Sequence, residues 1–213
     1  LLDPQEIEAE RQVILEEWQS SEDDPDEKLW EGVNTLALQR HPYRYPVLGW
    51  PEDIHKLSRE QINTHYSLYY HPNRATLVLV GDLPANAIER IQEYFGQIPA
   101  GPDLLEHRIQ ERPASQSERR LTLTRSDIQV PRLAVAWPAP ALKHPDYLSF
   151  LLIHYLLTEG WSSRLHQLLV EKNQVATEVS SLIFETQDPY LFWLLIDVQP
   201  GIQASRVETL LFE

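Results

Sequence analysis

Residues 6–19 read EIEAERQVILEEWQ, a stretch that combines five glutamates with a regular apolar stripe. Asp3 is a suitable helix cap and Pro4 suits a first helical turn, so the stretch predicts a helix. At about 100° per residue, Glu10 and Glu17 lie about 20° apart on one face and roughly 10 Å apart along the axis. The apolar side chains that flank this line are Ile7, Val13, Ile14 and Trp18.

The two carboxylates therefore fall in the middle of the predicted apolar face, whereas Glu8 and Glu16 point outward. Ionised carboxylates on a buried face are costly unless they are paired or bind a metal. The pattern leaves two explanations open. Glu10 and Glu17 form salt bridges with arginines from elsewhere, or they belong to a metal site.

The composition narrows the class of protein. The 213 residues carry a formal net charge of −14 and no cysteine, and 42% of them are hydrophobic. No basic stripe is present, which argues against nucleic-acid binding, and no apolar run reaches the length of a membrane span. Disulfides and cysteine-based zinc sites are excluded. The chain starts LLDPQE and holds no methionine, so we expect a piece of a longer protein.

The pattern along the chain predicts an α+β fold. Helices are expected at 28–40, 52–57, 58–70, 84–98, 145–157, 162–172 and from 203 onward. Strands are expected at 75–82, 119–125, 129–140, 176–186 and 190–199. Residues 99–118, with three prolines and many polar side chains, are typical of a linker. Both halves join strands to packing helices, which suggests two related units.

Four stretches together resemble one family, the M16 zinc peptidases, which include pitrilysin, insulysin and the mitochondrial processing peptidase. They are IEAERQVILEEW, HPYRYPVLGWPEDIHKLSREQI, YYHPNRATLVLVGD and GWSSRLHQLLVEKNQV, in this order. The resemblance is strongest to the bacterial zinc proteases of the family. It implies two related domains, each a β-sheet packed on one side by helices. Residues 1–98 would end the first domain, 99–118 would link, and 119–213 would form an incomplete second domain.

The resemblance also assigns the two glutamates. In the family, two histidines of an HxxEH motif and a glutamate on a later helix hold Zn²⁺, and the glutamate inside HxxEH polarises the zinc-bound water. The later helix has the spacing ExxxxxxE. Glu17 matches the zinc ligand, and Glu10 matches a second carboxylate that supports the site.

The other zinc ligands are missing from these residues. The eight histidines include no pair four residues apart, so the chain has no HxxEH. The sequence DLLEH at 103–107 only resembles that motif, and it follows the glutamate helix instead of preceding it. His65 and His71 are six residues apart and do not share a helical face. We therefore expect that these 213 residues alone neither bind zinc tightly nor cleave peptides.

The sequence of the second half of the chain indicates whether a partner subunit is needed. Many family members carry an arginine and, seven residues later, a tyrosine that help to bind substrate, often on a zinc-free partner subunit. The matching positions here hold Val170 and Thr177, and Arg164 is not a substitute. The chain thus resembles the zinc-bearing half, which implies a partner M16 chain, identical or different, or a downstream half.

Three functional hypotheses follow. The first is part of a zinc metalloendopeptidase that hydrolyses peptides or unfolded segments. The second is a non-catalytic homologue, a structural, assembly or substrate-binding subunit that has lost zinc; Glu10 and Glu17 argue against it. The third is an α+β binding module with salt-bridged glutamates. The resemblance leaves the substrate and the compartment open, since bacterial relatives include periplasmic and cytoplasmic proteins.

Overall fold

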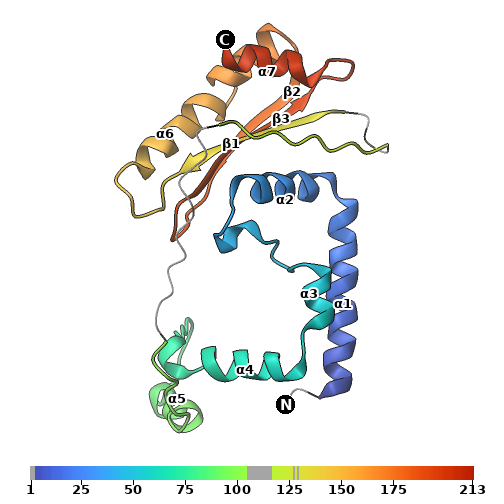
Figure 1. The fold of residues 1–213 in the computed structure, drawn as a ribbon. Helices are drawn as coiled ribbons and strands as arrows, with labels where there is room; N and C mark the ends of the chain where they lie inside the picture. The colour runs from blue at the N-terminus through green and yellow to red at the C-terminus, as the bar shows by residue number, and fades with distance from the viewer. Residues whose placement is uncertain (1–2, 105–116, 127, 129) are drawn as a thin grey trace. The chain divides into compact units, whose positions relative to one another are not determined.

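A computed structural model describes residues 3–104, 117–126, 128 and 130–213. The chain divides into two compact units, Leu1–Ser20 with Val47–Arg108, and Ser21–Pro46 with Ile109–Glu213. In this division residues 21–46 group with the second unit. The regular elements of the described residues are helices and one antiparallel sheet (Figure 1). This agrees with the predicted α+β class.

The second unit is built on a three-stranded antiparallel sheet of order β1-β3-β2. Its strands are β1 (Arg132–Ala139), β2 (Ala176–Ile183) and β3 (Tyr190–Val198). The central strand β3 reads YLFWLLIDV, a nearly continuous apolar run, as expected for a strand covered on both faces. The predicted strands at 129–140, 176–186 and 190–199 are confirmed.

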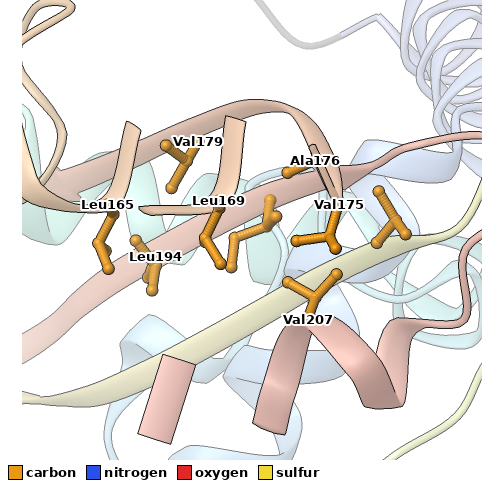
Figure 2. Close-up of a cluster of buried hydrophobic side chains, with 9 residues drawn as sticks. Leu165, Leu169, Val175, Ala176, Val179, Leu194 and Val207 are labelled. Carbon is orange, nitrogen blue, oxygen red and sulfur yellow. The ribbon is translucent and has the colours of Figure 1, made fainter. Parts of the chain in front are cut away.

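One face of the sheet is covered by three helices: α6 (Tyr147–Thr158), the π-helix η3 (His166–Lys172) and α7 (Ala204–Phe212). Leu194 and Ile196 of β3 meet Leu169 of η3 and Val207 of α7 in a buried cluster (Figure 2). Each of these four side chains is at most 1% exposed. Apolar burial on this face is therefore the core of the unit.

The opposite face is covered by α2 (Pro25–Ala37). Asp24 caps this helix by accepting the N–H of Asp26, and Pro25 takes the first helical position. Trp30 stacks on Trp193 of β3, with ring centroids 3.9 Å apart and planes 7° from parallel. The sequence predicts helices on one face only, whereas the structure adds α2 on the second face.

The first unit is helical. Its elements are α1 (Pro4–Asp23, whose last turn belongs to the second unit), α3 (Pro51–Lys56), α4 (Arg59–Tyr69) and α5 (Ala87–Phe95). Helix α4 begins with a capping box. The Ser58 side chain accepts the N–H of Gln61, and the Gln61 side chain accepts the N–H of Ser58.

The turn after α4 holds the start of the predicted linker. The one-turn helix η2 (Pro72–Arg74) presents Asn73, whose side chain accepts the Gly101 N–H at 2.8 Å and donates to the Gly101 carbonyl at 3.3 Å. Arg74 donates to the carbonyl of Pro102. The rest of this linker falls mostly on residues 105–116, which lie outside the described residues.

Two predicted strands are not formed. Residues 75–80 carry no strand, and the side chains of Leu77 to Val80 are exposed. A strand needs a hydrogen-bonded neighbour, and the described residues of this unit supply none. Ile88, Tyr94 and Phe95 on α5 are exposed as well, because no described element covers them.

The predicted strand at 119–125 is replaced by a segment that side chains hold in place. Arg119 donates to the carbonyl of Leu36, and Arg125 donates to the carbonyl of Glu22. Arg120 forms an ion pair with Glu208 of α7. Guanidinium groups thus satisfy backbone acceptors where a strand ladder was expected.

Candidate metal-ligand helix

The predicted carboxylate helix is one continuous helix of 20 residues, α1. The Asp3 side chain accepts the N–H of Gln5 at 2.8 Å, and the Asp3 carbonyl accepts the N–H of Ile7, so Asp3 caps the helix as predicted. Continuity of the helix from Pro4 to Asp23 places Glu10 and Glu17 on one edge, about 20° apart. Two carboxylates thus share one side of a regular helix.

Both carboxylates are exposed, and α1 has no buried residue. The prediction that they lie on a buried face is therefore not met within this chain, because no described element covers that face. Among the residues that the structure describes, neither the Glu10 nor the Glu17 carboxylate has a hydrogen bond or an ion pair. In the described part of the chain no arginine pairs with Glu10 or Glu17, so the salt-bridge explanation has no support there.

The guanidinium of the neighbouring Arg11 forms hydrogen bonds with other groups. Its guanidinium donates to the carbonyl of Ile54, to the carbonyl of Leu57 at 2.8 Å and to the Glu8 carboxylate at 3.1 Å. Hydrogen bonds from Gln12 and Arg11 lower the pKa of Glu8. The sequence gives no signal for the contact with Ile54 and Leu57, which joins an ordinary surface position to backbone atoms more than forty residues away.

A separate ion-pair cluster ends this helix. Lys28 forms ion pairs with Glu22 and Glu31, the latter at 2.8 Å. Burial lowers the pKa of Lys28, but hydrogen bonds to the two glutamates outweigh this and raise it. Lys28 thus offsets one of the two negative charges of Glu22 and Glu31, and Glu17 lies outside this cluster.

The described histidines take structural positions. His41 is buried; its Nδ1 accepts the N–H of Tyr43 at 3.2 Å, and its Nε2 lies 3.5 Å from Asp188. His71 contacts the carbonyl of Ser67 at 2.7 Å, and His65 lies against the ring of Tyr69. Within the described ranges, no three acidic or histidine side chains converge as a metal site.

The sequence DLLEH at 103–107 falls largely outside the described residues. In the second unit, Val170 packs against the buried cluster, and the exposed Thr177 donates to the carbonyl of Asp197 at 3.3 Å. Arg164 is exposed between the buried Ser163 and Leu165. In the part of the chain that is described, no helix is long and apolar enough to cross a bilayer.

A model of a known protein family matches most of the chain. Residues 56–213 match the model described as "Peptidase M16 inactive domain". The chain belongs to the M16 peptidase family. The matched range begins within α3 and so follows Glu10 and Glu17 in the chain. The M16 resemblance that the sequence predicts is confirmed.

The relatives are zinc proteases and processing peptidases. The zinc protease PqqE of Helicobacter pylori is 27% identical over 206 residues, which cover 93% of this chain and 46% of that protein. A protein of Arabidopsis thaliana described as "Probable mitochondrial-processing peptidase subunit beta" is 23% identical over 72% of this chain and 29% of its own length. The chain thus spans about half or less of these M16 relatives.

The fold agrees with a solved M16-type structure. A protease from Helicobacter pylori superposes with a TM-score of 0.82 at 26% identity, covering 97% of this chain and 50% of that chain. The predicted α+β M16-like fold is thereby confirmed.

The donor chemistry of α1 fits zinc in part. Carboxylate oxygen is an accepted zinc ligand beside histidine, and an exposed carboxylate without a competing cation is free to take that role. Zinc sites in proteins use three or four protein ligands, so α1 can supply only one or two of them. Two imidazoles would have to come from outside these residues.

Proposed function

We propose that this chain is part of a zinc-dependent endopeptidase of the M16 family, in which Glu17 is the zinc ligand on the later helix and Glu10 supports the site. The two histidines and the general base would come from an HxxEH segment outside these 213 residues. We further propose the domain division 1–98, 99–118 and 119–213 for the longer protein.

One observation carries this proposal. Glu10 and Glu17 lie on one edge of α1, exposed, with no partner among the described residues, while Arg11 is committed to α3. Two surface glutamates at this spacing repel each other weakly and add no packing, so the pair does not stabilise the fold. The spacing fits a ligand and a supporting carboxylate that face a metal.

The chain's own residues would act by binding and orientation. Glu17 would donate a carboxylate oxygen to the metal, and Glu10 would accept a hydrogen bond from a group beside it and so fix its orientation. Zinc, when bound, polarises the peptide carbonyl and makes its bound water a nucleophile at neutral pH. The second unit would close the substrate chamber together with a partner M16 chain or a downstream half.

A second candidate is a non-catalytic subunit of the same family. The matched model is described as an inactive domain, which is compatible with it because residues 56–213 carry no catalytic motif. The carboxylate pair on α1, which precedes that range, favours the peptidase.

The test is peptide hydrolysis by the longer protein that contains this chain. An unfolded peptide with a quenched fluorophore should be cleaved, cleavage should stop on treatment with a zinc chelator, and added zinc should restore it. Glu17→Gln should lower kcat/KM by at least about 100-fold, while the adjacent Glu16→Gln should leave it unchanged. Cleavage that survives the chelator, or no cleavage in any preparation that binds zinc, would refute the peptidase.

A further inference from the structure

Helix α3 ends without a glycine or backbone cap. Its C-cap residue Leu57 is extended, with φ −63° and ψ 115°. The last carbonyls of a helix have no partner inside it and need a donor from elsewhere. Arg11 supplies that donor: one guanidinium nitrogen donates to the carbonyl of Ile54 and the other donates to the carbonyl of Leu57.

The same guanidinium is fixed from its own helix. Its Nε donates to Glu8, three residues earlier, and only 14% of the Arg11 side chain is exposed. Three N–H groups of one planar fork are thus engaged in three directions. Such a fork holds its geometry more firmly than a single flexible contact would.

This clamp fixes the rotation of α1. Glu10 lies about 100° from Arg11 around the helix axis, and Glu17 lies about 120° from it. None of the side chains of α1 is fully buried, and Ile7, Ile14, Leu15 and Trp18 are only partly buried, so apolar packing constrains its rotation less than it would in a core helix. Anchoring Arg11 on α3 therefore sets the direction in which the carboxylate edge points.

We propose that Arg11 is a positioning residue for the zinc ligand Glu17, acting through the clamp on the carboxyl end of α3. The proposal rests on the proposed function, in which Glu17 binds zinc. A metal ligand has to be held within about 0.5 Å of its productive position, and a helix free to rotate does not meet that tolerance. Arg11 touches neither metal nor substrate.

The experiment uses the longer protein that contains this chain, with zinc itself as the probe. The zinc Kd is measured by competition with a chromophoric chelator, at a temperature below the melting transition of every variant. Arg11→Gln should raise the zinc Kd by about tenfold, and Arg11→Lys should raise it by less. The control is Arg59→Gln on the surface of α4, which should leave the Kd unchanged.

A double-mutant cycle separates positioning from general damage. With Glu17→Gln already present, Arg11→Gln should weaken zinc binding no further, because the carboxylate that it positions is gone. If Arg11→Gln weakens binding equally in both backgrounds, or leaves the Kd unchanged while Glu17→Gln raises it, Arg11 has only a structural role. If Glu17→Gln itself leaves the Kd unchanged, the proposed function fails and the positioning role fails with it.

Discussion

The indole of Trp30 on α2 lies stacked on the indole of Trp193 at the centre of the sheet, with ring centroids 3.9 Å apart. Trp193 is fully buried. This contact joins a helix from the first quarter of the chain to the strand β3 near its end. It explains why residues 21–46 belong to the second compact unit.

Replacing Trp30 by alanine should detach α2 from the sheet. We expect a loss of about 3 kcal/mol in the free energy of unfolding of the second unit, since a large aromatic contact and its burial are removed together. Urea titration followed by circular dichroism measures this loss. Trp161→Ala is the matched control, because that indole is 84% exposed, and it should change stability by no more than about 0.5 kcal/mol. Equal losses in both variants would show that the stacking contributes nothing.

Alkaline pH should destabilise the second unit through Tyr190. Its hydroxyl donates to Asn34 on α2 at 2.6 Å, and burial raises its pKa above the ordinary value of 10.0. A raised folded pKa means that the stabilisation is complete below about pH 10 and is lost as the pH rises through the folded pKa. Unfolding free energies measured from pH 8 to 11.5 should therefore fall above about pH 10.

Tyr190→Phe should make this fall shallower, because the titrating group is gone. At pH 8 it should also cost about 1 kcal/mol through the unpaired Asn34 amide. Tyr155→Phe, which alters an exposed ring on α6, is the control. An unchanged slope in Tyr190→Phe would assign the alkaline loss to other groups.

The attachment of α6 to the sheet includes a buried polar network. Ser181 of β2 lies 2.8 Å from Nδ1 of His154 and 2.6 Å from the hydroxyl of Thr158. Ser181→Ala should cost about 1–2 kcal/mol in unfolding free energy, because it leaves the buried Thr158 hydroxyl and the partly buried His154 ring without this partner. Ser180→Ala, next to it on the other face, should cost under about 0.5 kcal/mol. Thermal and urea unfolding that rank the two variants the other way would contradict the network's role.

Gly101 has to be glycine because of its neighbour His71. A Cβ added at Gly101 would lie 2.2 Å from the imidazole Cδ2 and 2.8 Å from the Cβ of His71. We expect Gly101→Ala to cost on the order of 2 kcal/mol and to expose the residue-101 amide, now bonded to Asn73, to hydrogen exchange. His71→Ala removes the two nearest of these contacts, to Cδ2 and Cγ, and keeps the one at 2.8 Å, so the cost should drop in that background. An equal cost in both backgrounds would assign the effect to the backbone alone.

The helices were predictable from sequence because their hydrogen bonds are internal and their caps are local. Ser58 with Gln61, and Asp3 before Pro4, mark helix starts that the structure reproduces. The strand at 75–82 was not formed, because a strand depends on a neighbour that local pattern does not reveal. The π-helical form of η3, which ends near Gln174 in the left-handed region, carries no pattern of its own in the sequence.

The sequence likewise predicts one part of the candidate site and not the other. The helical period alone predicts that Glu10 and Glu17 share an edge, and α1 has the continuity that this requires. The clamp from Arg11 to the carbonyls of Ile54 and Leu57 could not be predicted from the sequence, because every residue has such a backbone carbonyl. The predicted burial of the edge is not met among the described residues, because a helical period shows which residues share a face but not what packs against it.

The most direct test is zinc binding by the longer protein and by residues 1–213 alone, measured as Kd by chelator competition. The longer protein should bind one zinc ion, Glu17→Gln should raise its Kd by at least about 100-fold, and Glu16→Gln should have no effect. Residues 1–213 alone should show no binding tighter than about 1 μM, because one carboxylate is not a zinc site. Unchanged affinity in Glu17→Gln, or micromolar binding by the 213 residues alone, would contradict the assignment of Glu17 as the third ligand of a shared zinc site.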